Sequence, residues 1–322
     1  MTSIESTVER INKMASKSQE MPKCFSFSVE NTEGDKRKAT IHVDKSGVKS
    51  GLRSVDPWMM VFLSTLQKFH LDLPITDVSV EFCHKPPTVD LESFCRRWSY
   101  LAINNGWNAS IVVAGESESN KSYRTISELL DRPDDEVWRD GFNERNDNLD
   151  SNGKIEKNLQ TWLAGNSRDD NERLAVLGED FIFGKGPKPK VIREFPTGAF
   201  RGSKSRLNRL LKTYWVDLVT LNRSRQLAII ELKVNDGKLD VMAQALDYAL
   251  FFSCYRKLLA ANLTKSLGRP VDGSTKIACY VASNCFHQKF PEVSKFYSPK
   301  SDQWPFILKR CTLGAMPFGN SL

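Results

Sequence analysis

Two strand-like segments joined by a short polar turn bring an aspartate, a glutamate and a lysine into a pattern that can do metal-dependent chemistry. Successive side chains alternate faces on a strand, so Glu231 and Lys233 share one face. A symmetric turn centred near Ser224 would set Asp217 opposite Glu231. The two segments are Trp215–Leu221 and Leu227–Val234.

This trio has the residue types that phosphodiester hydrolysis requires. Two carboxylates bind a hard cation such as Mg²⁺, and an ammonium two residues further on can hold or polarise the attacking water. Most Glu-x-Lys pairs are solvated charges on an edge strand, which is the alternative. Here the pair ends an apolar, β-branched run, where unpaired charge is costly and favours an active site.

Two flanking segments show helical periodicity. Residues 155–163 have an amphipathic stripe with Glu156 near the start, where a glutamate can also simply complement the helix dipole. Residues 240–263 form a second expected helix, with Gln244 and Tyr248 one turn apart. These two residues either position the substrate or form a polar pair at the helix–sheet boundary. With another strand at 276–282, the pattern predicts an α/β sandwich with a mixed sheet.

The C-terminal half resembles the PD-(D/E)xK nuclease superfamily over roughly residues 154–285. Asp217 corresponds to the first acid of the motif, and Glu231-Leu232-Lys233 corresponds to its ExK element. The segment 155–163 resembles the acid-bearing opening helix, Arg193–Thr197 the first strand, and Gln244 to Tyr248 the Q-xxx-Y helix. In motif order the chain is most similar to mismatch endonucleases of the NucS/EndoMS type and to Shedu-like antiphage nucleases.

The sequence departs from the superfamily pattern at two places. Val216 replaces the proline that names the motif, and a long basic insertion separates Thr197 from Asp217. The resemblance implies a restriction-endonuclease-like fold that uses Mg²⁺ or Mn²⁺ and leaves a 5′-phosphate. It also implies roles for individual residues. Asp217, Glu231 and the Leu232 carbonyl bind metal, Lys233 orients or deprotonates water, Glu156 completes the outer shell, and Gln244 positions the nucleophile or phosphate.

Charge is divided unequally between the two halves. Residues 1–150 hold 19 basic and 24 acidic residues, whereas residues 151–322 hold 27 and 15, so the half with the acidic motif is the basic one. A cationic surface around metal-binding carboxylates suits a nuclease, because the phosphate backbone dominates affinity for nucleic acid. The alternative is a solvated basic face. The residues expected to contact nucleic acid are Arg201, Lys204, Arg206, Arg209, Lys212 and Tyr248.

The N-terminal half, residues 1–150, reads as a separate α+β domain without a recognisable motif. Polar residues 131–153 are expected to link it to the nuclease domain at 154–322. Its acidic balance suits sensing or docking of something other than a polyanion, such as a defence-complex partner or a second copy of the chain. The expected strands are 24–30, 38–43, 77–82 and 107–113, and the expected helices are 58–69, 90–103 and 124–130.

Composition predicts a cytoplasmic protein with reduced thiols. The 322 residues contain no run of eighteen apolar residues and no signal-like N-terminal segment. The seven cysteines have no CxxC spacing, and nothing near Cys83-His84 completes a zinc site. We therefore expect a metal-dependent nuclease acting on DNA in restriction, repair or antiphage defence. The alternatives are a catalytically retired nuclease fold that binds nucleic acid or a partner, and an RNA-directed effector nuclease.

Overall fold

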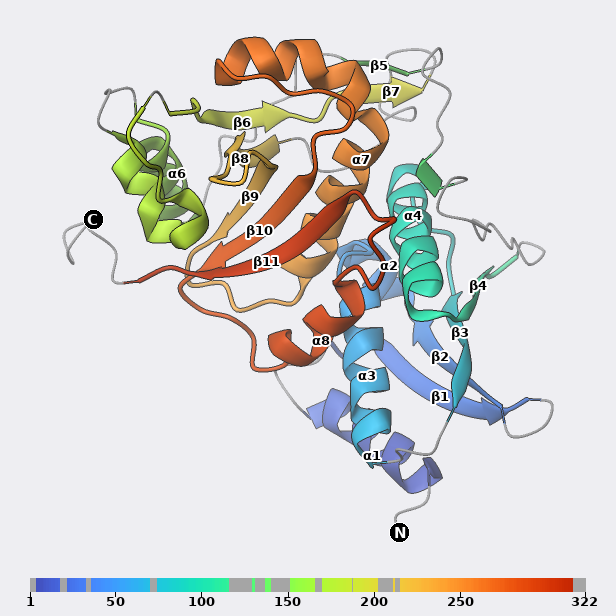
Figure 1. Ribbon diagram of the computed structural model, residues 1–322. Helices are drawn as coiled ribbons and strands as arrows, with labels where there is room; N and C mark the ends of the chain where they lie inside the picture. The colour runs from blue at the N-terminus through green and yellow to red at the C-terminus, as the bar shows by residue number, and fades with distance from the viewer. Residues whose placement is uncertain are drawn as a thin grey trace. The chain divides into compact units, whose positions relative to one another are not determined.

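The computed structural model describes residues 4–17, 22–32, 36–69, 74–115, 129–130, 137–139, 151–165, 170–186, 188–201, 211 and 215–314. The chain divides into two compact units, one of residues 1–129 with 289–301 and one of residues 130–288 with 302–322. Each unit contains a mixed sheet, of four and five strands respectively, so the protein is α/β with two α/β regions (Figure 1). No helix in these ranges combines the length and apolar character that crossing a bilayer requires.

The first unit is built on a sheet in the order β1-β2-β3-β4. Strand β1 is antiparallel to β2, whereas β2, β3 and β4 run parallel. Parallel neighbours need crossover connections, which α3 and α4 provide, so this unit is α/β and the expected α+β arrangement was wrong. Its first elements are α1 (Ile4–Lys17), β1 (Phe25–Asn31), β2 (Arg37–Val43), α2 (Lys45–Ser50), α3 (Val55–Phe69), β3 (Ile75–Phe82), α4 (Thr88–Asn105) and β4 (Asn108–Val113).

A helix from far along the chain completes this unit. Helix α8 (Phe290–Tyr297) follows β10 in sequence, yet it packs on α3 and α4. Its apolar residues fall on one stripe and are buried, with Val293 and Tyr297 fully so. The Tyr100 hydroxyl donates to the Tyr297 carbonyl at 2.7 Å. The first unit is therefore formed from two separate segments of the chain.

The second unit is built on a sheet in the order β11-β10-β9-β8-β6. Residues 137–139, inside the segment expected to be a linker, form a short strand that pairs with β7. The rest of that segment up to residue 150, and most of the helix expected at 124–130, lie outside the described residues. The elements are β5 (Val137–Arg139), α6 (Ser151–Leu163), η2 (Asp170–Leu177), η3 (Glu179–Phe181), β6 (Ile192–Pro196), β7 (Ala199–Arg201), β8 (Trp215–Leu221), β9 (Leu227–Lys233), α7 (Asp240–Leu267), β10 (Ile277–Ser283) and β11 (Phe306–Thr312).

The β8–β9 hairpin has the register that the sequence predicts. Leu221 pairs with Leu227 and Leu218 pairs with Ile230, so the hairpin is symmetric about Ser224. The ladder ends at the pair of Leu218 and Ile230, and Asp217 and Glu231 are the next residues beyond it on the two strands. The hairpin therefore brings the two acids to the same end of the sheet.

Both sides of the central strands are covered. Ile230 and Leu232 of β9 pack in one buried cluster with Leu159 and Leu163 of α6. Helix α7 packs on β8, β9, β10 and β11, and it ends at Gly268, whose φ of 65° allows the left-handed cap. Strands buried on both faces read as continuous apolar runs, so a charged residue within them is conspicuous.

Candidate active site

Three elements of the second unit supply a compact cluster of charged side chains. Glu156 comes from α6, Asp217 from β8, and Glu231 and Lys233 from β9. The Lys233 ammonium lies 2.7 Å from Glu231 Oε1 and 3.6 Å from Glu156 Oε1. The structure thus brings together four of the five residues that the sequence analysis names as catalytic.

Asp217 is fixed by two hydrogen bonds where β8 and β9 part. Its Oδ2 accepts from the Leu232 backbone N–H at 2.7 Å, and its Oδ1 accepts from Gln160 Nε2 at 2.8 Å. In an extended strand the N–H and C=O of one residue project to the same side, so the Leu232 carbonyl leaves the backbone toward Asp217 as well. This is the arrangement that a carbonyl ligand next to the first acid requires.

Gln160 is the residue that sequence reasoning missed. It follows Glu156 by four positions, so both lie on the same face of α6 and face the cluster. Its side chain is 6 % exposed, and its amide is the one buried donor from α6 that reaches an acid in the described part of the chain. The helical spacing from Glu156 was the available signal.

Burial and crowding shift the protonation of the acids. The Asp217 carboxyl has its pKa raised well above the usual range, first by burial and then by the neighbouring Glu231 charge. Burial also raises the pKa of Glu156 to about 7, with Lys233 opposing and Glu231 adding to the shift. Ionising all three carboxyl groups beside one ammonium would leave an excess of negative charge, which a dication would neutralise.

Lys233 is held in its charged form. Burial by itself favours the neutral amine, but the carboxylates of Glu231, Asp217 and Glu156 outweigh it and raise the lysine pKa above its ordinary value. A lysine in this state donates hydrogen bonds and does not accept a proton. In the metal-free protein it therefore orients groups and does not act as a base.

Glu231 carries the clearest sign that the cluster is incomplete. The residue is 2 % exposed, and its Oε2 atom makes no hydrogen bond to the described part of the protein, whereas Oε1 bonds Lys233. A buried carboxylate oxygen without a partner is costly, and a hard cation is the ligand that such an oxygen accepts. The donor set therefore fits Mg²⁺ or Mn²⁺.

The cluster holds too few side-chain ligands to enclose an ion alone. In the ranges that the structure describes, no group of three or more His, Cys, Asp or Glu side chains is placed to hold a metal ion. Cys83 and His84 are therefore not part of such a group. Mg²⁺ keeps several waters and is often held by one or two carboxylates together with substrate phosphates. Two acids and one carbonyl match that open type of site.

Backbone strain flanks the cluster. Glu194, which lies opposite Asp217 on β6, has φ 51°, and Asn235, two residues after Lys233, has φ 55°. Non-glycine residues adopt such angles at a cost, and they concentrate at functional sites. The Glu194 carboxylate lies 3.9 Å from the Arg193 guanidinium.

Gln244 and Tyr248 of α7, both expected at the site, form hydrogen bonds that lead to the backbone of β8. Gln244 Nε2 donates to the Tyr248 hydroxyl at 3.1 Å, and that hydroxyl donates to the Trp215 carbonyl at 2.6 Å. Tyr248 is only 1 % exposed, so the expected nucleic-acid contact is wrong for this residue: its ring is in the core. The chain of hydrogen bonds anchors β8 two residues before Asp217.

The expected basic contact run cannot be placed. Lys204, Arg206, Arg209 and Lys212 lie outside the described residues. Arg201 ends β7, and its side chain is also outside the described part. Their contact with nucleic acid stays a prediction.

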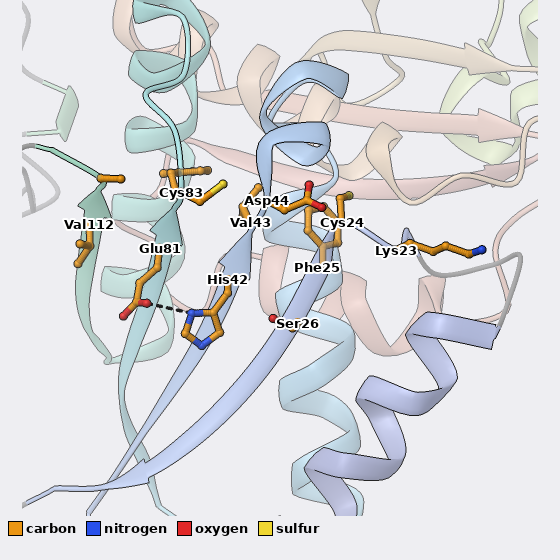
Figure 2. A pocket seen from close by; sticks show the side chains of 12 residues that line it. Lys23, Cys24, Phe25, Ser26, His42, Val43, Asp44, Glu81, Cys83 and Val112 are labelled. Carbon is orange, nitrogen blue, oxygen red and sulfur yellow. Dashed lines mark ion pairs between the residues drawn. The ribbon is translucent and has the colours of Figure 1, made fainter.

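The first unit holds a different polar cluster on its sheet. Ser28 Oγ lies 2.9 Å from His42 Nε2, and His42 Nδ1 lies 2.9 Å from Glu81 Oε2. His42 and Glu81 border a cavity of about 480 Å³ at the carboxyl ends of β2 and β3, as Figure 2 shows. The order of groups is that of a serine nucleophile, its base and an orienting acid.

The geometry of the strands argues against nucleophilic catalysis there. Backbone pairing of Thr32 with Lys36 and of Cys24 with Asp44 sets the alternation of the β1–β2 ladder. That alternation places the Ser28 backbone in a hydrogen-bonded pair, so its N–H is not available to stabilise an oxyanion. His42 and Glu81 are each 39 % exposed, which keeps water in contact with the pair. The charged cluster of the second unit is therefore the stronger candidate for an active site.

Comparisons with models of known protein families, with curated proteins and with solved structures found no match for this chain. The functional interpretation rests on the residues and their geometry.

Proposed function

We propose that the second unit is a divalent-metal-dependent nuclease with a restriction-endonuclease-like fold. The observation that carries this proposal is the largely buried trio of Asp217, Glu231 and Lys233, in which Glu231 Oε2 has no hydrogen-bond partner in the described part of the chain. The order of strand, turn and strand, with an acid-bearing helix before it, supports the resemblance to the PD-(D/E)xK superfamily. A site that only bound a partner would not need two buried carboxylates beside an ammonium.

Each residue has a task that its position supports. Asp217 and Glu231, with the Leu232 carbonyl, would hold Mg²⁺ or Mn²⁺, and Gln160 keeps Asp217 in place. A bound dication would polarise the phosphate and lower the pKa of water for in-line attack. Lys233 would hold the attacking water or a phosphate oxygen through its ammonium. Glu156 limits the motion of Lys233, and Gln244 with Tyr248 fixes the backbone of β8.

DNA is the favoured substrate, and restriction, repair or antiphage defence is the favoured setting. The excess of basic over acidic residues in 151–322 supports a polyanionic substrate, whether DNA or RNA. An RNA-directed nuclease is the second candidate within the same chemistry. In both cases the first unit would serve as a sensor, a docking module or an oligomerisation surface.

The deciding experiment is a cleavage assay on DNA and RNA with Mg²⁺, Mn²⁺, Ca²⁺ or EDTA. We expect product with Mg²⁺ or Mn²⁺, binding with little turnover in Ca²⁺, and no product in EDTA. Glu231→Gln keeps the shape but removes the charge, and it should lower cleavage at least a thousandfold, about 4 kcal/mol of barrier.

Arg223→Gln is the matched control, because Arg223 is exposed on the β8–β9 turn, at the opposite end of the hairpin from Glu231. It should cleave like the wild type. Equal cleavage by wild type and Glu231→Gln, or full activity in EDTA, would refute the proposal. Tight nucleic-acid binding with no cleavage under any metal would instead support the retired nuclease fold.

A further inference from the structure

A groove on the outer side of α6 has the composition of an anion-binding site. Its volume is about 680 Å³, and its described lining contains two arginines and no carboxylate. Its polar and aromatic lining residues are Asn158, Thr161, Trp162, Arg173 and Arg193. None of them belongs to the acid cluster or to the basic run at 201–212.

Both arginines are held in place before any ligand arrives. Arg173 Nη1 donates to the Trp162 carbonyl at 3.0 Å, and its guanidinium lies 5.3 Å from the centre of the Trp162 ring. Arg193 Nη1 donates to Thr161 Oγ1 at 2.5 Å. A guanidinium has five N–H donors in a planar fork that matches the geometry of a phosphate, and a phosphate at Arg193 would compete with the Glu194 carboxylate 3.9 Å away. Fixed arginines lose little side-chain entropy on binding.

The groove adjoins the acid cluster through two elements. On α6, Thr161 and Trp162 lie on the side of the helix away from Glu156 and Gln160, as their spacing at 100° per residue requires. On β6, Arg193 pairs with Leu218, the residue after Asp217. A helix with its side chains is about 10 Å across and strands lie about 4.8 Å apart, so the groove begins roughly 10 Å from the acids.

We propose that this groove binds the phosphodiester backbone of the nucleic-acid strand at phosphates next to the one that is cut. The inference rests on the proposed nuclease function and names a binding site for its substrate. Arg173 and Arg193 would each contact a phosphate, and Asn158 and Thr161 would supply neutral polar contacts. An acidic protein segment would be attracted by the same charge, but the adjoining phosphodiester site favours nucleic acid.

The test measures binding separately from cleavage. Labelled single-stranded and duplex oligonucleotides of one sequence, as DNA and as RNA, are titrated by fluorescence anisotropy in Ca²⁺ at several salt concentrations. Arg173→Gln and Arg193→Gln should each weaken binding about tenfold. Each should also reduce the slope of log affinity against log salt by about 0.7–0.9, because one phosphate contact is lost. Arg223→Gln should change neither quantity.

Two further measurements keep the result interpretable. Arg193→Lys keeps the charge but not the fork, so the salt slope should be retained while affinity falls less than in Arg193→Gln. Thermal unfolding of each variant identifies folding defects, which lower the active fraction without changing the salt slope. Unchanged slopes in both glutamine variants would overturn the groove assignment.

The outcomes separate this inference from the proposed function. Metal-dependent cleavage with wild-type binding by both arginine variants would refute the groove and leave the nuclease proposal standing. Absence of both binding and metal-dependent cleavage in the wild type would refute both. An acidic peptide that binds the protein without displacing the oligonucleotide would also count against the groove.

Discussion

A buried ion pair in the first unit and a largely buried one in the second unit differ in how completely their polar atoms are hydrogen-bonded. In the first unit, Arg97 holds Asp56 through Nε and Nη2, with the shortest contact at 2.8 Å. Asp56 also accepts from the Tyr297 hydroxyl at 2.6 Å, and Arg97 donates to the Leu52 carbonyl at 3.0 Å. Both side chains are at most 1 % exposed, and both oxygens of the acid are used.

In the second unit, Lys233 is outnumbered by Asp217, Glu231 and Glu156, and Glu231 Oε2 has no hydrogen-bond partner among the residues that the structure describes. A satisfied buried pair is consistent with a structural role, whereas an unsatisfied excess of like charge is tolerated where function requires it. The difference teaches that burial of charge by itself does not identify an active site. What distinguishes the second cluster is an unpaired carboxylate oxygen beside a second acid and an ammonium.

The largest expected effect concerns the satisfied pair. Asp56→Asn should lower the free energy of unfolding by roughly 3–5 kcal/mol, because the Arg97 guanidinium is left buried without its counter-charge. Urea unfolding measures this, with Asp44→Asn, at an exposed helix cap, as the milder comparison. A loss of unfolding free energy below about 1 kcal/mol would mean that the complete hydrogen bonding of the Asp56–Arg97 pair does not stabilise the fold.

The second prediction concerns the pH dependence of stability in the unsatisfied cluster. The Glu156 pKa is raised to about 7 from an ordinary 4.5, so the folded protein binds more protons than the unfolded chain between these values. Metal-free protein should therefore lose stability as pH rises from about 4.5 to above 7, and Glu156 should contribute about 3 kcal/mol of this loss. The raised Asp217 pKa acts in the same direction.

Glu156→Gln provides the control for this titration. The variant should be more stable than the wild type above pH 7 without metal, and its stability should depend less on pH in this window. Mg²⁺ should stabilise the wild type at high pH, since a bound dication favours the ionised acids. Metal-free unfolding curves that show rising stability over the same window would contradict the prediction.

Local sequence signals predicted the hairpin and its acids, because register in a tight turn depends on a few adjacent residues. The strands around Asp217 and Glu231 and the helix with Glu156 followed from periodicity in the same way. The place of helix α8 in the first unit could not be predicted, since its hydrogen bonds with Tyr100 and Asp56 join residues 197 and 241 positions apart. The burial of Tyr248 was missed for a related reason, because helical spacing does not show which face meets the sheet.

The third prediction concerns Gln160, a positioning residue. Gln160→Ala removes the amide that holds Asp217 Oδ1, and we expect turnover to fall about tenfold, or about 1.4 kcal/mol of barrier. The apparent affinity for Mg²⁺ should fall as well, because a mobile Asp217 binds metal less well. Gln160→Glu should be worse than Ala at pH 8, since it adds a fourth carboxylate. An effect on stability alone, with unchanged turnover and metal affinity, would assign Gln160 to packing.

The smallest expected effect concerns the hydrogen-bond chain from α7 to β8. Tyr248→Phe keeps the buried ring but removes the donor to the Trp215 carbonyl, which should cost about 0.5–1.5 kcal/mol of stability. Gln244→Ala should cost less stability, because its partner Tyr248 keeps its bond to Trp215. If this series of hydrogen bonds positions β8, both variants should lower turnover several-fold and leave oligonucleotide affinity in Ca²⁺ unchanged. A large drop in affinity for Gln244→Ala, with wild-type turnover on bound substrate, would instead place Gln244 in contact with nucleic acid.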